Sequence, residues 1–242
     1  MVIEMPRWTN AKMEMSLDEP LNPIKQDTSG GKLRYVPNCF PFHGIPWNYG
    51  ALPQTLEDPN IIDEFTKLKG DGDPVDAIEI GQRLPSCGEI LQVKVLGALA
   101  LVDRNKIDWK LIVLSVDDEL SGVINNLSDI DSSFPNLLSA VKEWFQVFKV
   151  VAGKPENYIC FNGEIQEREV AHLVIKSAHN SWKNLINDCN PSSIFCCNVT
   201  HYGNPHNVTI ADAETIVKAS PTPEKPHPKD PSVDLWHFVH KK

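Results

Sequence analysis

The chain has 242 residues, 41% of them hydrophobic, and carries a formal net charge of −9 at pH 7. This length allows one large domain or two small ones, with enough apolar residues for a sizeable core. No stretch approaches the roughly 18 consecutive apolar residues of a membrane span, and the acidic balance argues against nonspecific binding to nucleic acid. We therefore expect a globular protein with neither a membrane nor a nucleic acid as partner.

The cysteines and the N-terminal residues together predict a cytoplasmic protein. The six cysteines, none of which forms a C-x-x-C pair, are Cys39, Cys87, Cys160, Cys189, Cys196 and Cys197. This spacing suits neither a zinc site nor a disulfide framework, so we expect reduced thiols. Residues 1–6 have neither the basic start nor the apolar run of a signal peptide, and they are typical of the beginning of a strand.

Two short segments near the N-terminus alternate between polar and apolar residues. In residues 11–15, Lys12 and Glu14 share one face and two methionines share the other, and residues 32–36 alternate in the same way. Period-two alternation predicts half-buried strands, each with a charged face. Residues 37–60 are rich in proline, glycine and asparagine, and we predict loops there.

Residues 70–76, Gly-Asp-Gly-Asp-Pro-Val-Asp, place three carboxylates within a short turn. Gly72 lets the backbone turn sharply, and Pro74 favours an extended Asp73, so Asp71 and Asp73 can point the same way. Like charges this close raise one another's pKa unless a cation offsets them, and hard cations such as Mg²⁺ prefer oxygen ligands. A polar surface turn is the alternative interpretation. A calcium EF-hand loop is excluded because its required glycine and glutamate are missing.

A β-hairpin is predicted in the middle of the chain. Residues 90–102 form a long apolar run with β-branched residues, and residues 108–116 follow after a short loop. This pattern favours a core strand that turns back into a second strand. On the second strand, Asp108, Lys110 and Ile112 are expected to share one face.

Helical periodicity begins only after the hairpin. Residues 136–149, which follow a proline, and residues 166–187 have apolar positions spaced by three and four. The positions expected to be buried are Leu137, Leu138, Val141, Trp144, Phe145 and Phe148 in the first helix, and Val170, Leu173, Val174, Ala178, Trp182 and Leu185 in the second. Residues 190–242 are predicted to be loops ending in a short aromatic run. Strands first and helices later, without a repeat or a linker, predict a single domain over residues 1–242, with helices packed outside a β-barrel.

The acidic turn and its flanks resemble a known family. The run D-G-D-P-V-D-A at 71–77 resembles the signature of the family I soluble inorganic pyrophosphatases. Further blocks in the family's order are P-R-W-T-N-A-K-M-E, G-K-L-R-Y-V, N-Y-G-A-L-P-Q-T, D-x₄-D-W-K and V-F-K-V-V-A-G-K-P-E-N. The resemblance covers nearly the whole chain and is strongest to the fungal and animal branch. That branch usually carries a further N-terminal segment, so this chain looks short at that end.

The resemblance implies a fold and an activity. The fold is α+β, mainly β: a closed five-stranded barrel of OB type with peripheral helices. The activity is Mg²⁺-dependent hydrolysis of pyrophosphate to two phosphates by direct attack of a metal-activated water, with no covalent intermediate. Several Mg²⁺ ions are implied, with Mn²⁺ as a substitute, and paired metals can clamp the attacking and leaving oxygens.

The resemblance also assigns roles to the carboxylates. Asp71, Asp76 and Asp108 are expected to bind the first activating metal, and Asp76 is shared with the second. Asp103 and Asp108 are expected to bind a third ion that arrives with substrate, and Glu14 acts mainly through metal-bound water. Asp73 remains to orient or deprotonate the attacking water. Taken alone, Asp103 and Asp108 have a simpler interpretation as acidic residues of a solvated hairpin.

Matching cations are expected to bind the phosphates. These phosphate ligands are Lys12, Arg34, Lys110 and Lys149, together with the hydroxyl of Tyr49. Arginine suits a two-pronged grip on phosphate, and lysine supplies a compact charge. The alternative is ordinary ion pairing on a surface sheet, which contributes little to stability.

Two positions depart from the family's pattern, since Ile45 and Phe148 stand where it normally has tyrosines. Both changes remove a hydroxyl while leaving the metal carboxylates in place, so turnover is expected to fall and metal binding to survive. This loss supports a rival interpretation, in which a weakened relative serves as a dimeric binding or scaffolding subunit.

A homodimer is expected from four residues that resemble the branch's dimer contact. They are Arg7, Trp8, His43 and Trp236, and aromatic rings and an arginine would stack there. The alternative is ordinary packing of aromatics at the chain end. The histidines do not cluster at metal-ligand spacing.

Overall fold

The computed structural model describes residues 1–188, 194–221 and 229–239. Cysteines within these ranges are free thiols, as predicted, and Cys189 lies outside them. None of the described helices is both long enough and apolar enough to cross a membrane.

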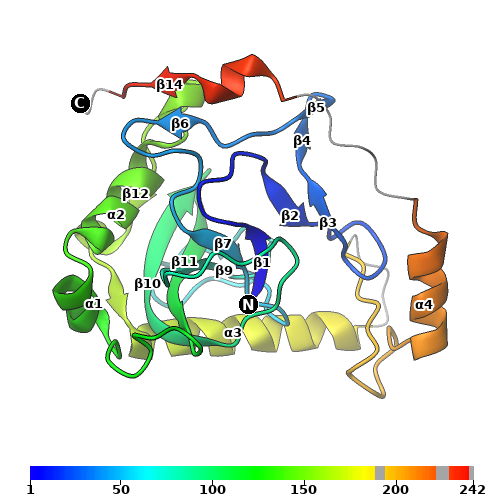
Figure 1. The fold of residues 1–242 in the computed structure, drawn as a ribbon. Coiled ribbons are helices and arrows are strands. Elements are labelled where there is room, and N and C mark those ends of the chain that lie inside the picture. Colours follow the sequence, from blue (N-terminus) through cyan, green and yellow to red (C-terminus); the bar gives the residue numbers. More distant parts are fainter. Residues whose placement is uncertain (189–193, 222–228, 240–242) are drawn as a thin grey trace.

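The described strands form one main sheet and three short ladders (Figure 1). The order of the main sheet is β1 (Val2–Met5), β7 (Asn48–Ala51), β9 (Asp76–Glu79), β11 (Lys106–Ser115), β10 (Val93–Asp103) and β12 (Tyr158–Ile159). Two strands join it off this path: β8 (Lys69–Gly70), parallel to β11, and β13 (Gln166–Glu167), antiparallel to β10. The short ladders pair β2 (Met13–Met15) with β3 (Ile24–Gln26), β4 (Thr28–Ser29) with β5 (Lys32–Leu33), and β6 (Asn38–Cys39) with β14 (Trp236–His237).

The described helices lie outside the sheet, and the last of them stands apart from it (Figure 1). They are α1 (Leu127–Ser133), α2 (Leu137–Val147), α3 (Arg168–Asn187) and α4 (Ile210–Ala219), with 3₁₀ turns at Val150–Ala152, Phe161–Gly163 and Pro231–Asp234. In Figure 1, α3 runs along the bottom of the main sheet, and the short ladders lie on the side away from it. The mainly-β architecture with peripheral helices is confirmed. Strand pairing among the described residues does not close into a ring, and the closed barrel stays a prediction.

The predicted hairpin is present, with its strands shifted by a few residues. Val102 pairs with Ile107 and Asp103 pairs with Lys106. Both residues of the connecting turn have positive φ, 49° at Arg104 and 64° at Asn105. Two left-handed residues in succession are typical of the tight turns that match the twist of a hairpin.

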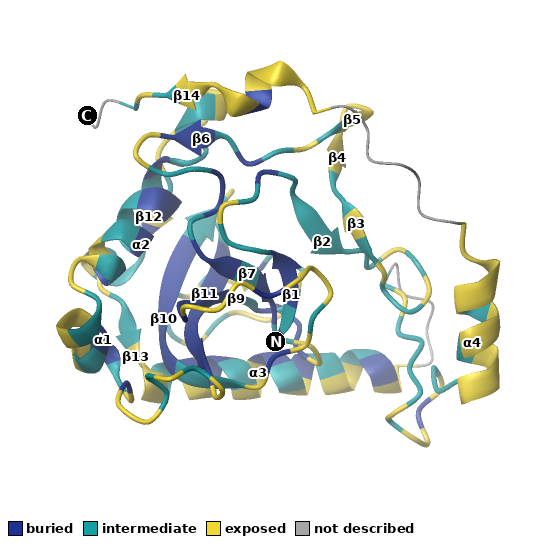
Figure 2. Ribbon diagram, in the orientation of Figure 1, coloured by how far each residue is buried: buried dark blue, intermediate teal, exposed yellow. Residues whose placement is uncertain are grey.

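The hairpin separates two hydrophobic clusters, and its strands are buried almost throughout (Figure 2). Ile112 and Leu114 belong to the cluster shared with α1 and α2, whereas Leu111 and Val113 pack toward α3. Asp108, Lys110 and Ile112 lie on the same face of β11, because side chains two residues apart on a strand share a face. This face carries charged groups at Asp108 and Lys110 and belongs to the hydrophobic core farther along the strand. A charge is costly to bury there unless it is paired.

Several predicted elements were wrong. The loop predicted over 37–60 contains β6 and β7, and the segments 11–15 and 32–36 are reduced to the shorter β2 and β5. The loops predicted over 190–242 contain α4, which Thr209 and Asp212 cap reciprocally, and also β14. The short α1 was not predicted.

The two predicted helices are present as α2 and α3, but one burial assignment was wrong. Leu173 is 47% exposed, because α3 buries the row of Ala171, Val174 and Ala178 instead. These residues are spaced by three and four, and two alanines let the helix lie close to the sheet.

Candidate active site

Lys110 is the centre of a buried polar group. The parallel pairing of β9 and β11 places Asp76 beside Lys110, and the strand's alternation places Asp108 on the same face. The Lys110 ammonium contacts both carboxylates and donates to the Tyr49 hydroxyl at 3.1 Å. Tyr49 in turn donates to Asp76. The strand register thus brings these predicted site residues together.

The electrostatics of this group favour charge on the lysine. Lys110 and Asp108 are only 4% and 8% exposed. Burial alone would lower the pKa of Lys110, but the charges of Asp108 and Asp76 outweigh it and raise that pKa well above its usual value. Burial raises the pKa of Asp108 to about 7 in spite of Lys110. One ammonium therefore leaves the carboxylates here incompletely neutralised.

The acidic turn is shaped as the sequence predicts. Gly72 has a φ of +101°, which favours glycine, and the Asp73 N–H donates to the Asp71 carboxylate at 3.0 Å. The turn is fastened to Glu57, whose N–H donates to the Asp73 carbonyl and whose carbonyl accepts from Gly72, both at 2.9 Å. A side chain at Gly70 would collide with the Glu57 carbonyl, since an added Cβ would lie 2.1 Å from it.

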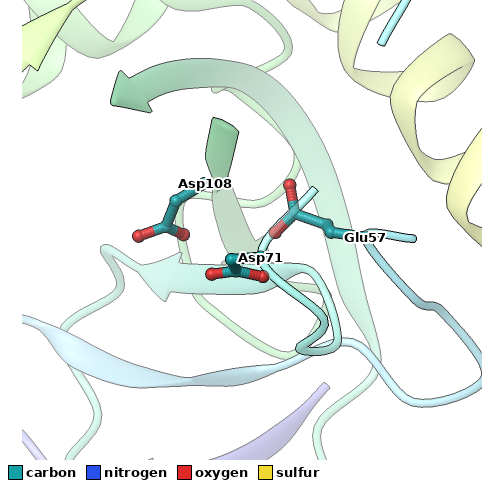
Figure 3. A group of neighbouring side chains, drawn as sticks. All are labelled: Glu57, Asp71 and Asp108. Atoms are coloured by element: carbon teal, nitrogen blue, oxygen red, sulfur yellow. The ribbon is translucent and has the colours of Figure 1, made fainter. Parts of the chain in front are cut away.

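Three carboxylates form a group that could bind a cation. Each of Glu57, Asp71 and Asp108 offers an oxygen within 4.8 Å of the others (Figure 3). Burial raises the pKa of Asp71 to about 6, with the Asp73 charge adding to the shift, and burial raises the pKa of Glu57 well above its usual value. The Oε2 atom of Glu57 is buried without a hydrogen-bond partner among the described residues. Clustered carboxylate oxygens, one of them unpartnered, fit a hard divalent cation.

Sequence reasoning missed Glu57, which lies in the segment predicted to be loop. No spacing in the sequence connects it to the acidic turn. In the predicted ligand set, Asp76 accompanies Asp71 and Asp108. In the structure Asp76 is paired with Lys110 and Tyr49, and Glu57 completes the group of three.

Asp73 lies at the exposed rim of the acidic turn. Partial loss of solvation raises its pKa to about 6, and the charges of Asp76, Asp108 and Glu14 add to this shift. A carboxylate with a pKa of about 6 can accept a proton near neutral pH and release it again.

The phosphate-binding cations predicted near the N-terminus gather around Asp27. Lys12 lies 3.1 Å from an Asp27 oxygen and also contacts Glu14, while Arg34 contacts the same Asp27 oxygen. Burial works against the charged form of Asp27, but Lys12 and Arg34 prevail and lower its pKa. Asp27, which sequence reasoning missed, thus connects two predicted cations.

The remaining predicted cation is paired near the hairpin turn. The Lys149 ammonium lies 2.8 Å from the Asp103 carboxylate. Lys149 directly follows Phe148, whose ring stacks on Trp144 at a centroid distance of 4.5 Å. Ile45 is 2% exposed within the hydrophobic core. Neither Phe148 nor Ile45 can supply a hydroxyl.

Glu4 is a second buried acid that sequence reasoning missed. It lies on β1, and its carboxylate accepts the Met15 N–H at 2.8 Å. Burial raises its pKa to about 8, and the Asp76 charge adds to the shift. A lone charged residue within the apolar strand Val2–Met5 was the only sequence signal for it. Glu4 connects the N-terminal strands electrostatically to the Lys110 group.

The chain is similar to known proteins of one family. A family model described as "Inorganic pyrophosphatase" matches residues 1–183. The inorganic pyrophosphatase of Drosophila melanogaster is 47% identical over 243 residues, covering 100% of this chain and 72% of that protein. A mouse relative named "Inorganic pyrophosphatase 2, mitochondrial" is 45% identical, covering 99% of this chain and 73% of that protein.

A solved structure shares the whole fold. The structure of inorganic pyrophosphatase from Schistosoma japonicum superposes with a TM-score of 0.93 at 41% identity, covering 99% of this chain and 85% of that one. The sequence matches and the shared fold lead to one conclusion: the chain belongs to the inorganic pyrophosphatase family.

Proposed function

We propose that this protein hydrolyses inorganic pyrophosphate to two phosphates with the help of Mg²⁺. The observation that carries the proposal is the buried group in which Lys110, Asp76, Asp108 and Tyr49 adjoin the carboxylates of Glu57 and Asp71. Buried carboxylates with strongly shifted pKa values are concentrated at functional sites, which supports the proposal. Membership of the family supplies the substrate.

The metal ligands proposed are the carboxylates of Asp71, Asp76, Asp108, Asp103 and Glu14. Bound divalent ions lower the pKa of a coordinated water toward about 7 and neutralise phosphate charge. Mg²⁺ suits these oxygen donors, and Mn²⁺ is expected to substitute.

Asp73 is proposed to orient and deprotonate the attacking water. Its position at the rim and its pKa of about 6 support this role. A group with such a pKa is largely ionised at neutral pH and still basic enough to accept the proton as the water attacks. The proton then passes to solvent, which reaches Asp73 directly, and no covalent intermediate is needed.

The phosphate groups are proposed to bind Lys12, Arg34, Lys110, Lys149 and Tyr49. Each of these cations is paired with a carboxylate in the structure described above. When metals neutralise the carboxylates, the ammonium and guanidinium groups become available to the substrate's oxygens. An acidic protein can in this way bind a polyanion.

The proposal also includes the architecture, the location and the assembly of the protein. We propose one domain whose main sheet closes as an OB-type barrel, a cytoplasmic location, and a homodimer. The dimer surface consists of Arg7, Trp8, His43 and Trp236. Arg7 lies over the Trp8 ring at 4.6 Å, His43 lies 3.1 Å from the Trp8 carbonyl, and His43 and Trp236 are 6.1 Å apart between ring centroids. Trp8 and Trp236 are exposed, so their rings are accessible to a second copy.

The rival, a weakened binding or scaffolding subunit, is not favoured. Its support is the absence of hydroxyls at Ile45 and Phe148, whereas every proposed carboxylate and cation is retained. The experiment that separates the two is phosphate release by the purified protein. We expect two phosphates for each pyrophosphate consumed in Mg²⁺, and background release from a phosphate monoester. Binding of pyrophosphate without its hydrolysis would establish the rival.

A further inference from the structure

The proposed reaction gives no role to the side chain of Glu57. Glu57 lies between β7 and β8, is 6% exposed, and directs its carboxylate toward Asp71 and Asp108 (Figure 3). Its Oε1 atom accepts the Trp109 N–H at 3.0 Å, while the buried Oε2 atom has no hydrogen-bond partner in the part of the chain that the structure describes. The carboxylate is therefore fixed at one oxygen and unsatisfied at the other.

The surroundings of Oε2 favour a positive charge. A buried oxygen without a partner costs free energy, and the neighbouring carboxylates of Asp71 and Asp108 repel it. The Lys110 ammonium is already in contact with Asp76 and Asp108. Backbone hydrogen bonds join Glu57 to Gly72 and Asp73, so Glu57 keeps its place relative to the acidic turn. The protein thus fixes an acceptor for which the described side chains supply no donor.

We propose that Glu57, through Oε2, is a further ligand of the divalent cation bound between Asp71 and Asp108. The inference rests on the proposed metal-dependent function and adds a ligand to it. Oxygens of an octahedral Mg²⁺ site at 2.0–2.1 Å lie about 3 to 4 Å apart. The oxygens of the three carboxylates all lie within 4.8 Å of one another, so small side-chain rotations would bring them to this spacing.

There is room for water beside Glu57. The side chain lines a pocket with Gly70, Trp109 and Ala178, whose cavity volume is about 40 Å³. A volume of roughly 10–15 Å³ is enough for one water. The pocket is therefore large enough for water beside Glu57.

The test is metal binding without substrate by Glu57→Gln. Glutamine keeps an oxygen for the Trp109 N–H but removes the charge. Calorimetric titration of chelator-treated protein with Mg²⁺ is expected to show one site at least about tenfold weaker than in the wild type. The metal-free variant is expected to melt at the same temperature as the wild type or higher, because repulsion with Asp71 and Asp108 is removed. The matched control is Asp58→Asn, which removes the same charge from the next residue and is expected to leave Mg²⁺ affinity unchanged.

The outcomes are distinguishable. A Mg²⁺ affinity of Glu57→Gln equal to that of the wild type would overturn the inference. A melting temperature of Glu57→Gln that is lowered equally with and without Mg²⁺ would also overturn it, because such a change indicates a role in packing alone. If Glu57→Gln does not fold, Glu57→Asp, which keeps the charge but shortens its reach, must bind Mg²⁺ more weakly; unchanged affinity overturns the inference. A wild type that hydrolyses pyrophosphate while Glu57→Gln binds Mg²⁺ normally refutes only this inference. A wild type that neither binds Mg²⁺ nor hydrolyses pyrophosphate refutes the proposed function itself.

Discussion

Asp73 and Asp76 belong to one turn but have different surroundings, and they are expected to respond differently to loss of charge. Asp73→Asn should lower the turnover number steeply with little change in Mg²⁺ affinity, because an amide keeps the shape but cannot accept the proton. Asp76→Asn should weaken metal binding as well, since Asp76 is placed among the metal ligands. Turnover and Mg²⁺ titrations on both variants check this. Equal loss of metal affinity in both would contradict the division of roles.

A hydroxyl at residue 148 is expected to improve catalysis. Phe148 directly precedes Lys149, whose ammonium lies 5.4 Å from the Phe148 ring centroid. Loss of one oriented donor can cost on the order of 10²-fold in turnover, an upper guide here because cations carry most of the neutralisation. Phe148→Tyr should therefore raise the turnover number, measured with the Michaelis constant across pH. Unchanged constants would show that the missing hydroxyl does not limit the rate.

Ile45→Tyr is expected to behave differently. Ile45 is buried in the core, so the larger ring should destabilise the fold by roughly 1–3 kcal/mol through overpacking. Its melting temperature should fall by several degrees, whereas Phe148→Tyr should melt near the wild type, since Phe148 is only partly buried. A stable Ile45→Tyr with raised turnover would show that the site can accommodate the family's usual ring.

At the residue scale, the sequence was informative where charges recur at fixed spacing. The Asp108–Lys110 pair follows from strand alternation, and the acidic turn follows from its glycine and proline. Glu57, Asp27 and Glu4 could not be predicted, because tertiary contacts alone bring them to the site. A single acidic residue in a loop or strand has no local signature of its surroundings.

At the scale of elements, β7 determines how the N-terminal strand reaches the site. Gly50 pairs with Ile3, and a Cβ added there would lie 1.9 Å from the Val2 carbonyl oxygen. Gly50→Ala should therefore destabilise the protein by roughly 1–3 kcal/mol and lower the melting temperature by several degrees. Gly122→Ala is the control, because an added Cβ meets nothing within 4 Å there. Equal melting temperatures for Gly50→Ala and the wild type would show that β1 and β7 can move apart without a loss of stability.

Predictability of the elements followed the strength of their local patterns. The hairpin of β10 and β11 was predictable because long apolar runs are bounded by polar turn residues. The strand Asn48–Ala51 was not, because Asn-Tyr-Gly-Ala lacks β-branched residues and becomes a strand only between β1 and β9. For α3, periodicity gave the helix and the buried Val174 and Ala178, but it assigned Leu173 to the buried face in place of Ala171, since the neighbours of a helix decide which of two adjacent rows faces the sheet.

At the scale of the whole molecule, the buried acids predict how stability depends on pH without metal. The pKa values of Asp71 and Asp108 rise from 3.8 to about 6 and about 7. Between pH 4 and 7 the native state thus retains protons that the unfolded chain has released, so stability falls as pH rises through this range. The lowered pKa values of Asp27 and Asp103 act in the opposite direction, but only at and below about pH 4.

Thermal unfolding of chelator-treated protein from pH 4 to 8 checks this dependence. The melting temperature should decline through the range, and Asp71→Asn, which removes one shifted group, should flatten the decline. Added Mg²⁺ should restore stability most at high pH, where the carboxylates are ionised. A melting temperature that rises steadily with pH in chelator would contradict the prediction.

The proposed dimer surface gives another test. Trp8→Ala combined with Trp236→Ala should shift the mass in solution toward the monomer, since large aromatic rings often contribute much of an interface's energy. Tyr202→Ala, which removes an even more exposed ring elsewhere, should leave the mass unchanged. Sedimentation at micromolar concentration measures both. A monomeric wild type would refute the dimer.

The measurement that tests the central claim most directly is the initial rate of phosphate release from pyrophosphate as a function of free Mg²⁺. The account predicts background release in chelator, restoration by added Mg²⁺, and a dependence on free Mg²⁺ steeper than first order, because more than one ion is needed. A first-order dependence would contradict the requirement for several ions. Equal rates with and without Mg²⁺ would contradict the metal-dependent reaction altogether.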